Sequence, residues 1–215
     1  MPPLPHGSEW IAVALAYLLG AVPCGWLLAR VVKGVDIRTV GSGNIGATNA
    51  MRVLGKPLGI VAFLGDFAKG AVPVAVFADA FAAGPLEGGA GAWLPVYCGA
   101  LAVAGHVWPI YLGFQGGKAV ATGCGAIVGI DPLIFVIAGL VWLGVLATTR
   151  FVGLASMAMG VAFPVAAWWR SEGQPYGTEV VLGTSALALL ILVRHRSNLV
   201  RMVAGQEPRI GAKRG

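Results

Sequence analysis

Residues 10–29 read WIAVALAYLLGAVPCGWLLA, a stretch in which no residue carries a charge. A helix needs about 20 consecutive apolar residues to cross the hydrocarbon core of a bilayer. The stretch therefore predicts a membrane-spanning helix. Six further apolar runs follow it, at residues 57–81 (interrupted by Asp66 and Lys69), 88–105, 119–130, 132–149, 151–169 and 180–193.

The composition agrees with a chain that lies mostly in lipid. Hydrophobic residues make up 57% of it and charged residues 11%, against about 25% charged residues in soluble domains. The mean hydropathy is +0.80. No internal repeat and no separate soluble segment is visible. We predict an all-α fold, a polytopic membrane helix bundle with seven transmembrane helices, in which residues 1–215 form a single domain.

The distribution of positive charge sets the expected orientation. The runs 119–130 and 180–193 are short enough to be re-entrant segments. However, Arg150 and the basic tail lie on the same side of the membrane as the first loop only if both of these runs cross it. Arg170 then lies alone on the opposite side, and Lys and Arg mark the cytoplasmic side. We expect the N-terminus outside and the C-terminus in the cytoplasm. The residues on the basic side are Arg30, Lys33, Arg38, Arg52, Lys56, Lys69, Lys118, Arg150, Arg194, Arg196, Arg201, Arg209, Lys213 and Arg214. Acids at or near the opposite face are Glu9, Asp79, Glu87, Asp131, Glu172 and Glu179.

Several protein classes are disfavoured. Residues 1–9 lack Lys and Arg, so the charged region of a cleaved signal peptide is absent and the first helix should stay. Cys24, Cys98 and Cys124 lie in apolar runs, which favours packing over a disulfide framework or a metal site. Anionic lipid accounts for the net charge of +6, and no nucleic acid is expected as a partner.

The first loop contains a glycine-rich segment, Gly41-Ser-Gly-Asn-Ile-Gly-Ala-Thr-Asn49, followed by Arg52. Glycines allow backbone N–H groups to turn inward as an anion-binding concavity, and the start of a following helix adds positive potential. Arg52 offers a bidentate fork that suits phosphate. The segment also matches the dinucleotide fingerprint G-x-G-x-x-G, but no strand or βαβ unit accompanies it. The segment indicates an anion site, with a solvated connector as the simpler alternative.

A second segment, residues 105–122, places Lys118 directly after Gly116 and Gly117. This resembles a phosphate-binding loop, although the spacing does not match that of the Walker A motif. The simpler interpretation is that Lys118 extends to the membrane interface. His106 lies about a turn and a half inside its apolar run, and it is equally compatible with a core histidine that bonds a backbone carbonyl and with a functional one.

The third segment follows the last apolar run, where Arg194, Asn198 and Arg201 fall on one side of a helix and His195 lies beside Asn198. A basic flank that binds anionic headgroups would not need His and Asn three residues apart. Ser156 is a weaker candidate that could bond the carbonyl four residues before it. Asp66 and Lys69 are expected to neutralise each other, because isolated charges in a membrane are costly.

The absence of several motifs limits the kinds of catalytic chemistry that the sequence predicts. The sequence shows no Cys and His cluster with metal spacing, no G-x-S-x-G elbow, and no His-x4-Asp dyad, since residue 111 is Tyr. The chemistry that the sequence still supports is anion binding by Arg, Lys and backbone amides. His195 is the obvious group at the cytoplasmic face that titrates near neutral pH.

Together these motifs resemble those of the bacterial acyl-phosphate:glycerol-3-phosphate acyltransferases, over essentially the whole chain. The motifs are Gly41–Asn49 with Arg52, Gly105-His106 through Gly116-Gly-Lys118 to Thr122, and His195-Arg-Ser-Asn198 with Arg201 and Gly205-x-Glu207. The chain departs from the family at Trp108, where Phe is usual, at Gln115, where Lys is common, and at Ala119, where Gly is common. The change at residue 115 removes a possible phosphate contact.

The resemblance implies an enzyme that transfers a fatty acyl group from acyl phosphate to the 1-hydroxyl of sn-glycerol 3-phosphate, which yields 1-acylglycerol 3-phosphate and phosphate and begins phospholipid synthesis. It implies no cofactor or metal, and a monomer in the bacterial inner membrane whose active site faces the cytoplasm. The catalytic residues it implies are His195, Asn198, Lys118 and Ser156. The substrate- and phosphate-binding residues it implies are Ser42, Gly43, Asn44, Gly46, Thr48, Asn49, Arg52, Gly116, Gly117, Thr122 and Arg201.

The residues make this chemistry physically reasonable. Acyl phosphate already has a good leaving group, so the catalyst must align the hydroxyl and stabilise negative charge, for which Lys118 and the glycine segment are candidates. Either His195 or a substrate phosphate could take the hydroxyl proton. A transporter for an organic anion is the competing function, but its site would lie near the bilayer midplane. A lipid-binding scaffold with a basic face would not need His195 or Asn198.

Overall fold

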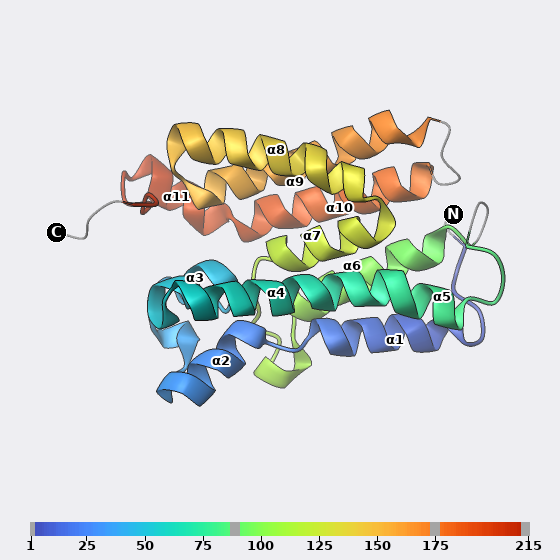
Figure 1. Ribbon diagram of the computed structural model, residues 1–215, viewed down its shortest axis with the longest axis horizontal. Helices are drawn as coiled ribbons and strands as arrows, with labels where there is room; N and C mark the ends of the chain where they lie inside the picture. The colour runs from blue at the N-terminus through green and yellow to red at the C-terminus, as the bar shows by residue number, and fades with distance from the viewer. Residues whose placement is uncertain (1–2, 87–90, 173–176, 212–215) are drawn as a thin grey trace. The chain divides into compact units, whose positions relative to one another are not determined.

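The computed structural model describes residues 3–86, 91–172 and 177–211. All the regular secondary structure in these ranges is helical, and no strand is present there (Figure 1). The chain divides into two compact units, Met1–Ile130 (unit 1) and Asp131–Gly215 (unit 2). Glu87, Gly88, Lys213 and Arg214, which entered the charge and span predictions, lie outside the described residues.

Unit 1 is a helical bundle in which α1 packs against α6 and α4 packs against α7. In Figure 1, α2 and α3 lie at one end of this unit and α5 lies at the other. The elements of unit 1 are α1 (Glu9–Gly20), α2 (Cys24–Lys33), η1 (Ile37–Thr39), α3 (Ala47–Leu54), α4 (Lys56–Val72), η2 (Pro73–Phe77), α5 (Ala78–Phe81), α6 (Trp93–Val107), η3 (Ile110–Leu112) and α7 (Val120–Ile130).

The apolar run at residues 10–29 lies in a 25-residue stretch, Glu9–Lys33, that is long and apolar enough to cross a membrane, as predicted. Its helix is interrupted, which differs from the single continuous helix that was expected. Helix α1 ends at Gly20 and α2 begins at Cys24, so the chain breaks at residues 21–23. Pro23 lacks a backbone N–H and disfavours the helical conformation of the residue before it, and Val22 is that residue. Beyond the break, α2 carries exposed Arg30 and Lys33 as well as exposed apolar side chains.

Small residues allow the helices of unit 1 to approach closely. A Cβ added at Gly70 of α4 would lie 2.0 Å from the carbonyl oxygen of Thr122 in α7. In the reverse direction, a Cβ at Gly125 would lie 1.9 Å from the carbonyl oxygen of Phe67. Contacts of this kind are typical of helices that associate in lipid, where packing replaces the hydrophobic effect.

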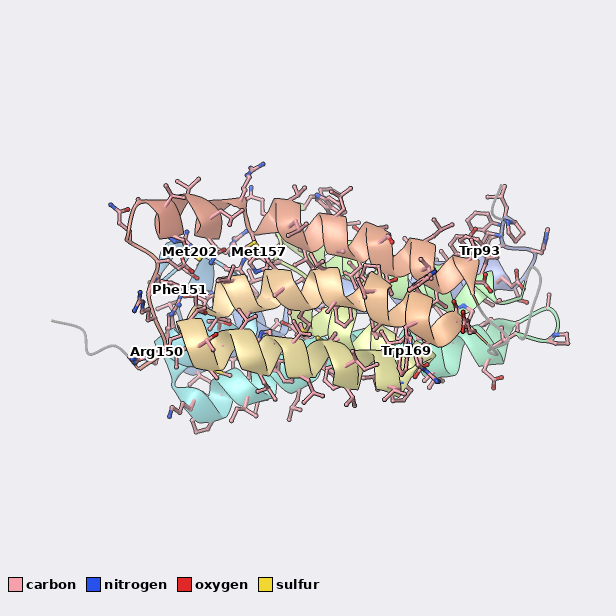
Figure 2. The ribbon with its side chains drawn as sticks, turned by 90° about the horizontal axis from the view of Figure 1, so that it is seen from above. Trp93, Arg150, Phe151, Met157, Trp169 and Met202 are labelled. Carbon is pink, nitrogen blue, oxygen red and sulfur yellow. The ribbon has the colours of Figure 1, made fainter. Side chains whose placement is uncertain are left out.

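Unit 2 consists of α8 (Pro132–Thr149), α9 (Val152–Ser171), α10 (Thr178–Arg194) and α11 (Arg196–Val203), and α9 packs against both α8 and α10. Asp131 caps α8 by accepting a hydrogen bond from the N–H of Leu133, and its other oxygen lies 2.9 Å from Nε of Arg170. Figure 2 shows Arg150 and Phe151 at the same end of the unit as Met202, with Trp169 at the other end.

The helix lengths account for most of the predicted spans. Within the described residues, five helical stretches are long and apolar enough to cross a membrane, and a sixth qualifies if α10 and α11, which are bent by 47°, count as one. Helix α7 has 11 residues and is shorter than these. The seven crossings and the sides of the two termini therefore stay predictions.

Candidate active site

The glycine-rich loop of unit 1 is shaped by a single buried amide. The side-chain oxygen of Asn49, in α3, accepts a hydrogen bond from the N–H of Ser42 at 2.8 Å. Its Nδ2 donates to the carbonyl oxygens of Ile37, Val40 and Asn44 at 3.1, 3.0 and 2.9 Å. Asn49 is 1% exposed. These four bonds engage both ends of the amide, so Asn49 supports the loop, and its predicted contact with phosphate would have to replace some of them.

Two glycines of this loop adopt left-handed backbone conformations, with φ of +64° at Gly41 and +69° at Gly43. A Cβ at Gly41 would also lie 2.2 Å from Oδ1 of Asn49. Asn44 closes the turn by accepting a hydrogen bond from the N–H of Gly46, which precedes α3. The loop therefore requires glycine at residue 41 for conformation and for space.

The predicted phosphate ligands around this framework are open to solvent. Ser42, Gly43, Thr48 and Arg52 are exposed, and Thr48 lies in the first turn of α3. Backbone N–H groups at the start of a helix favour a nearby anion. The loop thus combines a rigid, buried support with accessible donors.

An ion pair that the sequence analysis missed anchors the residues before the loop. Asp36 accepts hydrogen bonds from the N–H of Arg38 at 2.9 Å and from its guanidinium NH2 at 2.7 Å. Hydrogen bonds from Arg38 hold the pKa of the Asp36 carboxyl well below its usual range, and the same pairing raises the pKa of Arg38. Arg38 also donates to the carbonyl oxygen of Leu112 in η3 at 3.4 Å. The pair thereby links the first loop to the segment after α6.

The Gly116-Gly117-Lys118 turn folds back on the end of α6. The N–H of Gly116 donates to the carbonyl oxygen of Val107 at 3.1 Å, and the N–H of Gly117 donates to that of His106 at 3.0 Å. Gly117 is buried and Lys118 is half-buried. The side chain of Thr122 is completely buried in α7, and the carbonyl oxygen of this residue faces Gly70. The turn holds Lys118 in a fixed place, whereas Thr122 lies inside the helix packing.

The residue after Lys118 has a backbone conformation that favours glycine. Ala119 has φ of +61° and precedes α7, accepting a hydrogen bond from the N–H of Gly123 at 2.8 Å. A left-handed conformation costs an L residue with a Cβ about 1–2 kcal/mol. Glycine, common here in the family, avoids that cost.

Two charged residues within α4, Asp66 and Lys69, are buried. The Nζ of Lys69 lies 2.9 Å from Oδ1 of Asp66, which confirms their expected pairing. His106 is 3% exposed, and its Nδ1 lies 3.6 Å from the same carboxylate oxygen. His106 is therefore a core histidine beside a carboxylate.

In unit 2, His195 occupies the corner between α10 and α11 and is 4% exposed. Its Nδ1 lies 2.8 Å from the carbonyl oxygen of Ile191. Because a carbonyl oxygen can only accept, the hydrogen of the neutral ring belongs on Nδ1, and the lone pair belongs on Nε2. This tautomer gives His195 the electronic form that a general base requires.

Glu207 binds two other candidate residues of this corner, Asn198 and Arg201. Its Oε1 accepts a hydrogen bond from Nδ2 of Asn198 at 2.6 Å, and its Oε2 accepts one from Nε of Arg201 at 2.7 Å. Asn198 is 7% exposed, and a Cβ at Gly153 of α9 would lie 2.7 Å from its Nδ2. Glu207 belongs to the third motif, but the sequence alone predicts no role for it, and no sequence signal points to Gly153.

Ser156 lies one turn after Gly153 on α9 and is 4% exposed. Its hydroxyl oxygen accepts a hydrogen bond from Nε1 of Trp142, in α8, at 3.4 Å. A hydroxyl that accepts one hydrogen bond can still donate another, so this contact is compatible with the alternative in which Ser156 bonds the carbonyl four residues earlier.

The residues after α11 return to the turn between α8 and α9. Nε of Arg150 donates to the carbonyl oxygen of Ile210 at 2.9 Å, and the N–H of Ile210 donates to the carbonyl oxygen of Arg150, also at 2.9 Å. The guanidinium of Arg209 lies 4.9 Å from the ring centroid of Phe151. These contacts hold the segment that contains Glu207.

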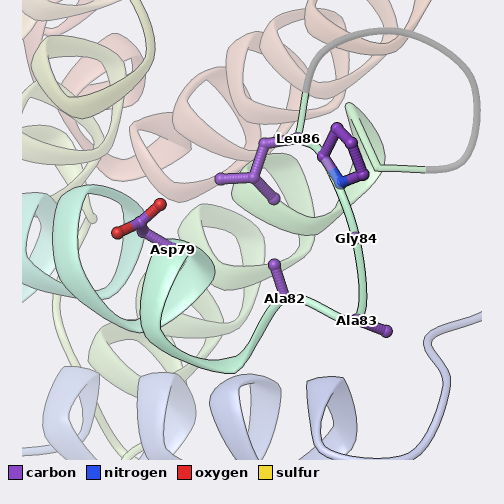
Figure 3. A pocket seen from close by; sticks show the side chains of 6 residues that line it. Asp79, Ala82, Ala83, Gly84 and Leu86 are labelled. Atoms are coloured by element: carbon purple, nitrogen blue, oxygen red, sulfur yellow. The ribbon is translucent and has the colours of Figure 1, made fainter.

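A cavity of about 600 Å³ lies elsewhere in unit 1, lined by Asp79 and by residues 82–86 (Figure 3). None of the candidate residues lines it. Its lining residues are at and after α5, and Figure 1 places this helix at the end of the unit away from α3. The cavity gives no support to the site derived from the motifs.

Comparison with known proteins identifies the family. The family model described as glycerol-3-phosphate acyltransferase matches residues 10–205. The glycerol-3-phosphate acyltransferase of Geobacter sulfurreducens is 43% identical over 207 residues, which cover 95% of this chain and 99% of that one. The enzyme of the same name from Synechococcus sp. strain CC9902 is 41% identical, covering 96% and 97% of the two chains.

Solved structures agree with the sequence matches. The glycerol 3-phosphate form of PlsY (YgiH), described as an integral membrane glycerol 3-phosphate acyltransferase, matches with a TM-score of 0.85 and 37% identity, covering 95% of this chain and 96% of that one. The lysophosphatidic acid form of PlsY matches with a TM-score of 0.82 and 36% identity, with the same coverage. The chain belongs to the glycerol-3-phosphate acyltransferase family.

Proposed function

We propose that this chain transfers a fatty acyl group from acyl phosphate to the 1-hydroxyl of sn-glycerol 3-phosphate, releasing lysophosphatidate and phosphate as the first step of phospholipid synthesis. The observation that carries the proposal is the match, at a TM-score of 0.85, to an acyltransferase structure described as its glycerol 3-phosphate form. The acyl phosphate donor follows from the family resemblance of the three motifs.

In the reaction, the hydroxyl oxygen attacks the carbonyl carbon of acyl phosphate as the hydroxyl proton passes to a base. The tetrahedral oxyanion then collapses, the bond from carbon to the phosphate oxygen breaks, and phosphate leaves with the electron pair. The two products are the ester and inorganic phosphate. Because acyl phosphate is an activated anhydride, alignment and stabilisation of charge are the main requirements on the protein.

In unit 1, the exposed donors of the glycine-rich loop would bind phosphate. Ser42, Thr48 and Arg52 are accessible, while the loop beneath them is fixed by Asn49. Lys118 and the amides of its turn would stabilise the oxyanion or a phosphate. A single well-placed donor contributes about 2.7–4 kcal/mol to transition-state stabilisation. The remaining unit 1 candidates, Gly43, Asn44, Gly46, Gly116, Gly117 and Thr122, would shape these two segments.

In unit 2, His195 is the candidate base, because the contact of Nδ1 with Ile191 assigns the lone pair of the neutral ring to Nε2. A phosphate of either substrate could take the proton instead, since the second phosphate pKa lies near 6. Asn198 and Arg201, held by Glu207, would orient substrate, and Ser156 would assist from α9.

The proposed setting is a monomer that crosses the bacterial inner membrane seven times, acts as one domain, and presents its catalytic residues to the cytoplasm. The one-sided distribution of Lys and Arg supports this orientation. Single cysteines placed in the 41–49 loop and in the 204–211 segment of a cysteine-free variant test it. In right-side-out vesicles, a membrane-impermeant maleimide should label neither cysteine until the membrane is permeabilised.

The activity is tested with protein purified in detergent and supplied with palmitoyl phosphate and radiolabelled glycerol 3-phosphate. We expect labelled lysophosphatidate, one phosphate released per ester formed, and no product when palmitoyl-coenzyme A replaces palmitoyl phosphate. Absence of ester with both donors would contradict the proposal. In proteoliposomes, accumulation of glycerol 3-phosphate without ester would favour the transporter.

A further inference from the structure

Unit 1 buries three ionisable side chains in one cluster. Asp66 and Lys69 lie on α4 with exposed fractions of 1% and 3%, and His106 lies on α6 with 3%. Oδ1 of Asp66 lies 2.9 Å from Nζ of Lys69 and 3.6 Å from Nδ1 of His106. Buried charges are costly to maintain even when they are paired. A function beyond helix packing would explain their presence.

One end of the cluster reaches the break between α1 and α2. Nζ of Lys69 donates a hydrogen bond to the carbonyl oxygen of Val22 at 2.7 Å. Val22 lies in the segment where Pro23 interrupts the helix, and backbone carbonyls at helix ends need partners from outside the helix. Lys69 therefore ties the break to α4.

The break in turn places the glycine-rich loop. Helix α2 starts directly after it, and a Cβ added at Gly25 would lie 2.2 Å from the carbonyl oxygen of Ile45. The backbone of α2 thus touches the backbone of the loop, and a displacement of α2 would be transmitted to it.

The other end of the cluster lies against the Gly116-Gly117-Lys118 turn. The carbonyl oxygen of His106 accepts the hydrogen bond from Gly117, and a Cβ at Gly117 would lie 2.1 Å from Nε2 of the His106 ring. The imidazole therefore fills the space beside Gly117. The other ring nitrogen, Nδ1, lies 3.6 Å from Oδ1 of Asp66.

We propose that Asp66, Lys69 and His106 are positioning residues, which form a buried connection between the α1–α2 break and the Gly116-Gly117-Lys118 turn. Through these contacts the cluster fixes two segments that bind phosphate groups of the substrates. The inference rests on the proposed function. None of the three side chains needs to touch substrate, so their loss should weaken substrate binding more than it slows the chemical step.

The first test is His106→Gln, which leaves the ion pair of Asp66 and Lys69 intact. Steady-state rates of lysophosphatidate formation are measured with each substrate varied in turn, together with the inhibition constant of inorganic phosphate. We expect KM to rise about tenfold for at least one phosphorylated substrate while kcat changes less than about threefold, the pattern produced by loss of uniform binding. Separate KM values distinguish the phosphate of glycerol 3-phosphate from that of acyl phosphate.

The second test is the neutral pair Asp66→Asn/Lys69→Gln, which removes both charges together and avoids leaving one of them unpaired. If the cluster acts through His106, this variant should show the same rise in KM, and combining it with His106→Gln should add little. Thr184→Val is the control, because Thr184 is equally buried and its hydroxyl bonds the carbonyl of Val180 in its own helix. It should leave both KM values unchanged.

Thermal unfolding in detergent identifies which of the two test variants is folded, and either folded variant decides the question. KM values within twofold of the parent protein in a folded variant would overturn the inference, even if the unfolding temperature falls. An inactive parent protein would contradict the proposed function instead, so the two failures are distinguishable.

Discussion

The glycine-rich loop of unit 1 and the corner around His195 in unit 2 are supported in opposite ways. The loop is held by the neutral amide of Asn49, and its candidate ligands Ser42, Thr48 and Arg52 are exposed. The corner is held by the carboxylate of Glu207, and its candidates His195 and Asn198 are buried. Exposed donors on a rigid loop suit the capture of a phosphorylated ligand. Buried side chains, with His195 on a backbone carbonyl and Asn198 on a carboxylate, suit the control of a proton and of orientation.

The strongest test of this contrast is Asn49→Asp, which keeps the size of the side chain. A carboxylate would face the carbonyl oxygens of Ile37, Val40 and Asn44 without a hydrogen to donate. Each buried group left without a partner costs about 1–3 kcal/mol, so we expect a loss of about 3 kcal/mol or more in unfolding free energy and of about 10²-fold or more in kcat/KM. Asn44→Asp keeps its acceptor for Gly46 and should change stability little. Equal stability of the two variants would remove Asn49 from its supporting role.

Arg52→Ala tests whether the loop serves binding rather than folding. Arg52 is exposed in the last turn of α3, so its removal should leave the unfolding temperature nearly unchanged. Activity should fall by about 10²–10³-fold, the usual effect of losing one preorganised donor. Lys56→Ala, which removes a second exposed positive charge nearby in the sequence, should retain activity in the same assay. Near-normal turnover of Arg52→Ala would exclude it from the phosphate site.

Two substitutions of His195 separate its structural contact from its chemistry. Asn at this position can still donate a hydrogen bond toward the carbonyl oxygen of Ile191 but has no lone pair in the place of Nε2, whereas Ala loses both. If His195 is the base, both variants should lose about 10²-fold in kcat, and the acidic limb of the pH profile should change. A loss of only severalfold in His195→Asn would assign the proton transfer to a substrate phosphate.

Glu207→Gln removes the negative charge of the corner and preserves the size of the side chain. Glu207 binds Asn198 and Arg201 with a side chain that is 5% exposed. Hydrogen bonds to a charged group are worth about 1.5–3 kcal/mol, so we expect stability to fall by that amount and kcat by about tenfold. Glu172→Gln, an exposed acid of the same unit, should match the parent protein. A neutral result for Glu207→Gln would mean that the corner, like the loop, needs only neutral hydrogen bonds.

The smallest expected effect is Ala119→Gly beside Lys118. Relief of the left-handed strain should outweigh the greater chain entropy of glycine, for a net gain of about 0.5–1 kcal/mol in unfolding free energy. Ala126→Gly, within α7, should act in the opposite direction, because glycine in a helix interior is unfavourable. Urea titration in mild detergent compares the two, and a loss of stability in Ala119→Gly would contradict the strain.

Features that depend on residues close together in the chain could be predicted from the sequence. The apolar runs predicted an all-helical membrane protein, and the three motifs predicted the family, both of which are confirmed. Pro23 lies within the first run, but the length of that run favours one continuous helix, so the break at residues 21–23 does not follow from the run alone. Helix α7 has only 11 residues, so the prediction that it crosses the membrane rests on the distribution of Lys and Arg alone.

Features that depend on contacts distant in the sequence could not be predicted. Asn49 has the residue type of a phosphate ligand, yet its bonds reach back as far as Ile37. Glu207 stands nine residues after its partner Asn198, and Gly153 approaches the same amide from another helix. The sequence predicted that Asp66 and Lys69 pair, whereas the approach of His106 to this pair required the fold.

The contact between Arg150 and Ile210 has a consequence for local opening. Segments outside helices normally unfold locally at little cost in free energy, independently of their neighbours. Here the N–H of Ile210 donates to the backbone carbonyl of Arg150, and the guanidinium of Arg150 donates back to the carbonyl of Ile210. Fraying of the 204–211 segment and loosening of the turn between α8 and α9 therefore become a single cooperative event. Release of the amide of Ile210 would then accompany release of the carboxylate that holds Asn198.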